Sequence, residues 1–145
     1  MRRAMITQKI GCLILSCTLC AFAAADELVV VVSSKNSLTS LRAEQVADIF
    51  LAQTGHFPDG AEAIAIDQRI GSNIRDEFYV KVAAKSPALV KAYWTKMIFT
   101  GRGQPPREIS NSIAVRKMVA DNPSLIGYID KAALDDSVKT VLVVH

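Results

Sequence analysis

The feature that most constrains the fold is an uninterrupted aliphatic run, Leu28-Val29-Val30-Val31-Val32. A half-buried strand alternates apolar and polar residues, so a continuous β-branched run indicates a strand that is buried on both faces. Strands of this kind are typical of parallel sheets that carry helices on each side. The run therefore predicts an α/β fold.

The rest of the chain alternates helical and strand patterns. Apolar residues recur at helical spacing in some segments and form short continuous runs in others. Helices are expected over about 42–51, after Gly71-Ser72-Asn73, from Ser86-Pro87, and after Ser110 or Ser112; further strands are expected at 63–66, 125–129 and 138–144. This alternation predicts a single three-layer α/β/α domain with a mainly parallel sheet, covering residues 26–145.

Residues 1–25 predict a secretory signal peptide. Three basic residues precede an uncharged apolar run at 10–22, and small residues follow up to Ala25. The run is shorter than the roughly 20 apolar residues of a membrane-spanning helix. An uncleaved anchor is one alternative, and lipidation at Cys17 is a weaker one. We expect export to the periplasm, with cleavage near Ala25.

Composition then excludes several functions for the mature chain. All three cysteines lie within residues 1–25, which leaves no disulfide, thiol nucleophile or cysteine metal site. Removing Arg2, Arg3 and Lys9 from the 17 basic residues leaves 14, equal to the 14 acidic residues. A neutral domain argues against nucleic-acid binding, which requires a basic face.

The sequence contains no recognisable catalytic motif. There are two histidines, His56 in a turn and His145 at the end, so no histidine pair stands at metal-ligand spacing. There is no Gly-x-Ser-x-Gly elbow and no Walker loop. The pairs Asp76-Glu77 and Asp135-Asp136 are expected to be solvated charges. The sequence therefore predicts a protein that is not an enzyme and that uses no metal or cofactor.

Two polar segments follow predicted strands and could bind an anion. In an open parallel sheet, ligands bind beyond the carboxyl ends of the strands, and a helix start there offers unpaired N–H groups. Gly71 allows close approach of the backbone, and Arg75 adds a fixed positive fork. We expect both segments at one edge of the sheet, with these ligand-binding residues: Ser33, Ser34, Asn36, Arg69, Gly71, Ser72, Asn73 and Arg75.

Each of these residues also has an ordinary structural interpretation. Ser72 and Asn73 are suited to capping the helix that they open. Arg69 and Arg75 could belong to a solvated helix face, and Ser33-Ser34 to an ordinary loop. The anion-binding hypothesis depends on the two segments lying together.

Several short motifs stand in a characteristic order across residues 38–130: Val46–Leu51, Pro58–Gly60, Gly71-Ser72, Phe78, Trp94, Phe99–Gly101 and Asn122–Ile129. Together they resemble the C-terminal lobe of the phosphate-binding proteins of ABC transporters, members of the type II periplasmic-binding-protein superfamily. The resemblance implies a periplasmic-binding-protein-like lobe, export, and a small oxyanion ligand such as phosphate. It also implies an ABC permease or a sensor protein as the partner.

The resemblance has two departures. The family grips phosphate with an Arg-x-x-Gly-Ser-Gly-Thr stretch, of which this chain keeps Gly71 and Ser72 but has Gln68, Asn73 and Ile74 at the arginine, second glycine and threonine. The chain also has about one lobe where the family has two, so weak binding is expected unless a homodimer or another protein supplies the second lobe. The alternative function is a periplasmic interaction module that keeps the fold without a ligand.

Overall fold

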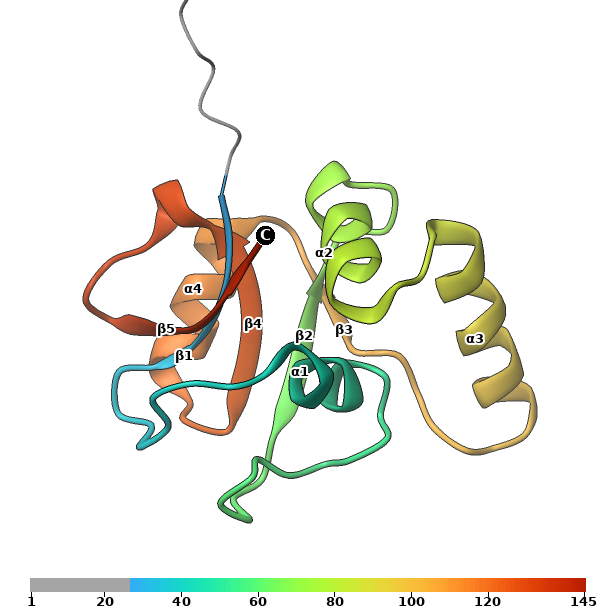
Figure 1. Cartoon of the computed structure of the whole chain (residues 1–145), viewed down its shortest axis with the longest axis horizontal. Helices are drawn as coiled ribbons and strands as arrows, with labels where there is room; N and C mark the ends of the chain where they lie inside the picture. Colours follow the sequence, from blue (N-terminus) through green and yellow to red (C-terminus); the bar gives the residue numbers. More distant parts are fainter. Residues whose placement is uncertain (1–26) are drawn as a thin grey trace, which may run out of the picture.

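The computed structural model describes residues 27–145, and the predicted signal peptide lies outside this range (Figure 1). Five strands form one sheet, and four α-helices and a short 3-10 helix, η1, connect them. In chain order the elements are β1 (Leu28–Ser33), α1 (Ala43–Phe50), β2 (Ile64–Gln68), α2 (Asn73–Ala83), α3 (Pro87–Phe99), β3 (Arg107–Ile109), α4 (Ser112–Asp121), β4 (Leu125–Asp130), η1 (Lys131–Ala133) and β5 (Val138–Val144).

The sheet is mixed, with four strands running in one direction and β1 in the other. The strand order is β3-β2-β4-β1-β5. β2 is parallel to β3 and to β4, whereas β1 is antiparallel to both of its neighbours, β4 and β5. The predicted mainly parallel sheet is thus confirmed, but the strand that suggested it is the reversed one.

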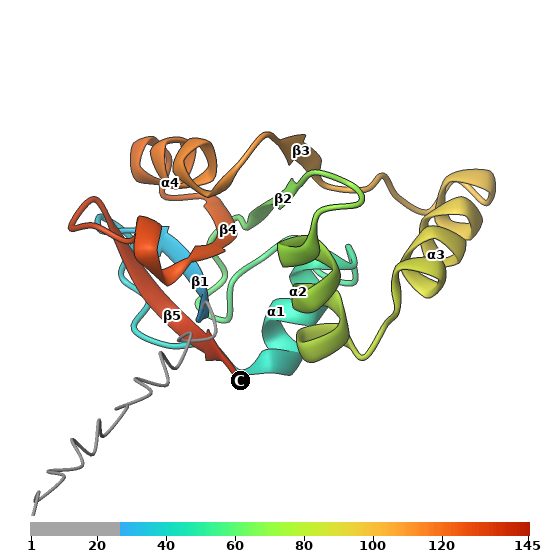
Figure 2. The same cartoon turned by 90° about the horizontal axis from the view of Figure 1, so that it is seen from above.

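Helices cover both faces of the sheet. Side chains of β1 alternate between two cores: Val30 and Val32 pack on the side of α1 and α2, while Val29 and Val31 pack on the side of α4. Figure 2 shows α4 on one face of the sheet and α1 and α2 on the other. Burial of β1 on both faces explains its continuous apolar run and confirms the predicted three-layer α/β/α arrangement.

Two elements differ from the sequence-based expectation at the end of the sheet. β2 continues to Gln68, beyond the predicted end at 66, and so carries Asp67 and Gln68 into the interior. β3 was not predicted, because three residues with two exposed side chains give no periodic signal. Both strands end near the start of α2, which they position.

The helix α3 stands apart from the sheet. It packs chiefly against α2, and it projects sideways in both views (Figures 1 and 2). Val90 and Trp94 are its buried residues. Among residues 27–145, no helix is long and apolar enough to cross a membrane.

Candidate anion-binding site

A buried polar cluster lies at the carboxyl end of β2, around the carboxylate of Asp67. This carboxylate accepts hydrogen bonds from the hydroxyl groups of Tyr128 and Tyr79 (2.8 Å for Tyr79) and from Nε of Arg75 at 3.1 Å. Asp67 is 1% exposed and Arg75 7%. A buried charge is tolerated only when it is paired and hydrogen-bonded, and here the partners of Asp67 come from two other elements. The cluster therefore joins β2 to β4 and α2.

The charges in the cluster fix its protonation. Burial, followed by the negative charge of Asp67, raises the pKa of Tyr79 and of Tyr128 far above that of an ordinary tyrosine. Burial is the largest single effect on Arg75 and lowers its pKa, but the charge and hydrogen bond of Asp67, together with Tyr79 and Tyr128, act in the opposite direction and leave the pKa raised. At neutral pH both tyrosines are therefore hydrogen-bond donors and Arg75 is a cation.

Gln68 is the second buried polar residue at this edge. Its side-chain amide donates to the hydroxyl of Ser112 at 3.0 Å and to the carbonyl of Tyr128 at 2.9 Å. Gln68 thus joins β2 to β4 and to the start of α4. At the position where the resemblance places a ligand-binding arginine, this chain has a residue that holds the sheet and a helix together.

The loop from Arg69 to Ser72 forms the entry to α2. Its backbone is closed by a hydrogen bond from Ser72 N to Arg69 O (3.1 Å), and the Ser72 hydroxyl donates to the same carbonyl (2.7 Å). The amide of Ile70 donates to a carboxylate oxygen of Glu108 at 2.7 Å. Gly71 has a φ of +85°, in the left-handed region that glycine adopts without strain.

The start of α2 lacks a side-chain cap. Ser72 occupies the N-cap position, but its hydroxyl is directed to Arg69 and accepts no hydrogen bond from the helix. By contrast, Ser86 caps α3 and Asn111 caps α4. Ser72 therefore occupies the expected N-cap position without supplying a side-chain cap, and the first amides of α2 are left without a side-chain acceptor.

A cavity of about 550 Å³ lies between the start of α2 and α3. Its lining includes the backbone of Gly71 and two cationic side chains, those of Arg75 and Lys91. Asp76 is the one acidic residue in the lining. The rest of the wall is largely apolar and includes Ile70, Trp94, Ile98 and Pro105. We refer to this space, between the start of α2 and the inner side of α3, as the α2–α3 cleft.

The structure places only part of the predicted site at the cleft. Gly71 and Arg75 line the α2–α3 cleft, and Ser72 and Asn73 lie beside Gly71 at the start of α2. Arg69 is exposed in the adjoining loop. Arg75, however, is also paired with Asp67, so the predicted free positive fork is instead half engaged by a buried carboxylate.

The second predicted segment lies elsewhere, and the expectation that both segments share one edge is wrong. Because β1 is antiparallel to β4, and β4 is parallel to β2, the end of β1 lies at the opposite edge from the end of β2. Ser33 is buried and donates to the carbonyl of Ala120 at 3.1 Å, and Asn36 donates to the carbonyl of Pro123 at 2.9 Å. Ser34, although exposed, belongs to the same turn. These three residues hold the turn after β1 and do not contribute to the α2–α3 cleft. The two-segment anion site predicted from the sequence is therefore overturned, and an anion site at this edge has to be argued from the start of α2 alone.

Sequence reasoning missed Asp67, Tyr79, Tyr128 and Lys91. The first three are separated by up to 61 positions and are joined by hydrogen bonds across the fold, so no local motif groups them. Asp67 offered one signal, a charged residue directly after an apolar strand. Among residues 27–145, no group of three or more metal-ligating side chains stands together.

Comparison with known proteins shows the fold. No protein-family model and no curated protein matches the chain. Among solved structures, a Clostridium perfringens protein assigned as a phosphate ABC transporter substrate-binding protein, with bound phosphate, is similar with a TM-score of 0.64 and 22% identity over 80% of this chain and 44% of its own. An ABC-type phosphate transport receptor from Vibrio cholerae is similar with a TM-score of 0.63 and 19% identity, over 80% of this chain and 45% of its own. PstS from Borrelia burgdorferi is similar with a TM-score of 0.58 and 16% identity, over 80% of this chain and 46% of its own.

These likenesses confirm the predicted periplasmic-binding-protein-like lobe. The chain spans less than half the length of each of the three proteins, as expected for a relative with one lobe. The first two are described as binding or transport proteins, and neither as an enzyme.

Proposed function

We infer that this protein binds a small oxyanion, of which phosphate is the first candidate, at the start of α2. The observation that carries the proposal is the uncapped start of α2, which borders a cleft lined by Arg75 and Lys91. A helix start combines unpaired amides with a partial positive charge, and two cations nearby favour a negative ligand. The likeness to structures described as phosphate-binding proteins supports the same ligand class.

The ligand-binding residues of this proposal are Gly71, Ser72, Asn73, Arg75 and Lys91, with the exposed Arg69 nearby. Arg75 would bind the ligand while still paired with Asp67, because its Nε makes that contact and the guanidinium has further donors. Ser33, Ser34 and Asn36 are excluded by their position at the opposite edge.

Isothermal titration calorimetry with phosphate and with sulfate tests the proposal. We expect saturable heat with a dissociation constant in the millimolar range. Ser72→Asp should abolish the heat, because an aspartate at the N-cap would occupy the amides of α2 and repel the anion. The same substitution should not lower stability, since aspartate is a favourable N-cap residue.

Asn111→Asp is the matched control. It introduces one carboxylate at the N-cap of α4, away from the α2–α3 cleft lining, and should retain the heat of binding. No heat at millimolar phosphate or sulfate would overturn the proposal, and so would binding that survives Ser72→Asp unchanged.

We also propose that the protein is exported through cleavage of residues 1–25 and delivers its ligand to an ABC permease or a sensor. The basic and apolar pattern of residues 1–25 and the likeness to transport receptors support this role. Mass spectrometry of the protein from the cell envelope should show an N-terminus within about two residues of Asp26. A chain that begins at Met1 would contradict export by cleavage.

A second candidate function is an interaction module that has the fold but no ligand. It is favoured by the apolar residues that α3 exposes to solvent, among them Leu89, Ile98 and Phe99. Calorimetry separates the two candidates, because an interaction module would give no heat with any small anion.

A further inference from the structure

The α2–α3 cleft is larger and less polar than an inorganic anion requires. Its volume, about 550 Å³, falls in the range of pockets that hold small organic molecules. Phosphate is small, and each of its oxygens needs a donor or water. Because most of the wall is apolar, a phosphate ion would leave the greater part of the cleft to water.

Arg75 supplies unused donors to the cleft from a fixed position. Its Nε donates to Asp67 at 3.1 Å, and the central carbon of its guanidinium lies 5.0 Å from the centre of the Tyr79 ring. Within residues 27–145, its other two guanidinium nitrogens, Nη1 and Nη2, have no hydrogen-bond partner. Arg75 is 7% exposed and lines the cleft, so a largely buried cation keeps donors available to a ligand there.

Trp94 lines the cleft from α3 and carries a second unused donor. Its side chain is 5% exposed, and its Nε1 is the one buried side-chain polar atom without a hydrogen-bond partner in the part of the chain that the structure describes. An unpaired buried donor is costly and is rare in folded proteins. Trp94 therefore marks the α3 side of the cleft as a surface that a ligand would complete.

Two large aliphatic side chains at the cleft are left in contact with solvent. Ile70, in the loop before α2, is 70% exposed, and Ile98, one turn after Trp94 on α3, is 49% exposed. Both line the cleft together with Trp94. Covering apolar surface of this kind is favourable, and inorganic phosphate has no apolar group that could cover it.

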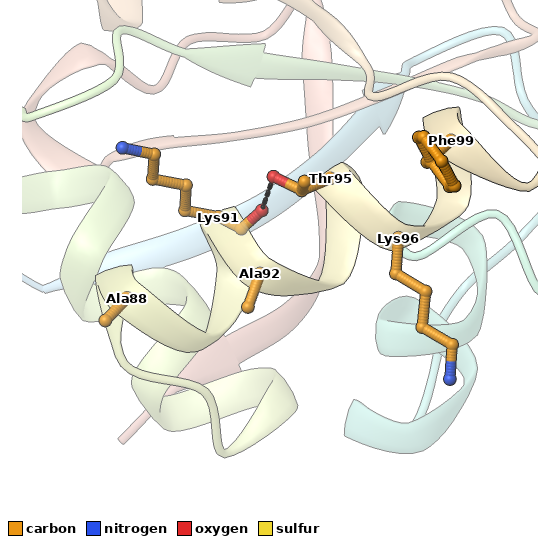
Figure 3. Close-up of a pocket in the computed structure, with 6 residues that line it drawn as sticks. All are labelled: Ala88, Lys91, Ala92, Thr95, Lys96 and Phe99. Atoms are coloured by element: carbon orange, nitrogen blue, oxygen red, sulfur yellow. Dashed lines mark hydrogen bonds between the residues drawn. The ribbon is translucent and has the colours of Figure 1, made fainter.

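The charges of the cleft suit one anionic group on an otherwise neutral ligand. Arg75 and Lys91 are its two cations and Asp76 is its one carboxylate, which leaves one net positive charge beside the helix start. Figure 3 shows Lys91 and Lys96 extending in different directions from α3, and Lys96 is not part of the cleft lining. The hydroxyl of Thr95 donates to the carbonyl of Lys91 at 2.8 Å (Figure 3), so it is not a free donor for an anion.

We propose that the α2–α3 cleft binds a phosphate monoester that carries a compact apolar group. The phosphate lies at the start of α2 beside Arg75, and the apolar group covers Ile70, Trp94 and Ile98. This assignment names the ligand class of the proposed function and rests on it, because the start of α2 is the same anion site. Inorganic phosphate is then a weaker ligand that occupies only the polar end of the cleft.

Calorimetry and fluorescence titration with butyl phosphate and with inorganic phosphate, at constant ionic strength, test the proposal. We expect butyl phosphate to bind about tenfold more tightly, because binding removes its alkyl group and the cleft wall from water. Trp94 is the single tryptophan of the chain, so its emission reports on this cleft alone and should change saturably with butyl phosphate. Butanol, which lacks the anionic group, should give no saturable heat.

Ile98→Ser removes part of the apolar wall and should weaken the binding of butyl phosphate about threefold. The ratio of the dissociation constants of inorganic phosphate and butyl phosphate should fall with it. Ile113→Ser, which removes a 52% exposed isoleucine from α4 outside the cleft lining, is the matched control and should keep the ratio of the unmodified protein. Circular dichroism and thermal melting confirm that both variants fold.

Four outcomes count against the inference. Inorganic phosphate that binds as tightly as butyl phosphate would overturn it and leave the proposed function standing. Butyl phosphate that binds without changing the emission of Trp94, or whose advantage survives Ile98→Ser in full, places its alkyl group elsewhere. Pentanoate that binds as tightly as butyl phosphate would assign the anionic group to a carboxylate. Absence of binding by all of these anions would overturn the proposed function as well.

Discussion

Asp67 organises the carboxyl edge of the sheet at the scale of single residues. Its carboxylate is surrounded by donors from three elements: Arg75 and Tyr79 on α2, Tyr128 on β4, and the amide of Gln68 on β2. The start of α2 is held against the sheet through these contacts. The geometry of the α2–α3 cleft therefore depends on a buried carboxylate that is not part of the cleft lining.

Asp67→Asn is expected to lower the free energy of unfolding by about 3 kcal/mol. The substitution leaves Arg75 buried beside a neutral group, and removal of one partner of a buried ion pair is strongly destabilising. Urea unfolding followed by circular dichroism measures the loss. Lys81→Gln, which removes an exposed ion pair with Glu77, should cost less than about 1 kcal/mol. Equal losses for the two variants would show that the Asp67 cluster does not stabilise the fold.

The buried tyrosines predict a loss of stability at high pH. Because the pKa of Tyr79 and of Tyr128 is raised in the folded protein, the unfolded chain loses these protons first, from about pH 10 upward. Stability from this source is complete below pH 10 and falls above it by about 1.4 kcal/mol per pH unit for each tyrosine. Urea unfolding at a series of pH values measures the slope. Tyr79→Phe should make it shallower, and an unchanged slope would contradict the assignment.

At this scale the sequence predicted local features and missed distant ones. Gly71 and Ser72 could be found because a polar Gly-Ser pair before a helix is a local pattern. The roles of Asp67 and Tyr128 could not, since 61 positions separate them and their hydrogen bond exists only in the folded sheet. Ser33 and Asn36 were assigned to the site because they follow a strand, but that strand runs the other way.

The packing of β4 against α4 shows how one element fixes another. A Cβ atom at Gly127 would stand 2.5 Å from Cγ1 of Val115 and 3.3 Å from Cγ1 of Ile66. Glycine at this position allows α4 to lie close on the sheet. The start of α4, which receives the hydrogen bond from Gln68 to Ser112, is positioned by the same contact.

Gly127→Ala is expected to cost about 1–3 kcal/mol, the usual range for overpacking a core. The melting temperature and urea midpoint should both fall. Gly55→Ala is the control, because a Cβ there meets no atom within 4 Å and the residue has no positive φ. A Gly127→Ala protein as stable as its Gly55→Ala counterpart would show that α4 can move away from the sheet without loss.

The type and order of most elements could be predicted, but the direction of one strand could not. Leu28–Val32 is apolar throughout because helices cover both faces of β1, and this burial pattern is the same whether the neighbours are parallel or antiparallel. Strand direction is set by the connections of the whole sheet. Because the direction of β1 could not be inferred from its residues, the two segments of the predicted site were expected at one edge, whereas they lie at opposite edges.

At the scale of the whole molecule, binding to a single lobe limits affinity. A micromolar site requires about 8 kcal/mol of net binding free energy. Contacts from one lobe, at about 1.5–3 kcal/mol for each hydrogen bond to a charged group, must also offset an association cost of roughly 4–15 kcal/mol. One lobe should therefore bind phosphate weakly, and a second wall over the α2–α3 cleft is what would make the binding tight.

The central claim, that the start of α2 receives the anion, is tested most directly by nuclear magnetic resonance of the ¹⁵N-labelled protein titrated with phosphate at constant ionic strength. The account predicts saturable shifts of the backbone amides of Asn73, Ile74 and Arg75, with the amides of Ser34 to Asn36 at the opposite edge unmoved. Unchanged amides at the start of α2, or larger shifts in the turn after β1, would contradict it.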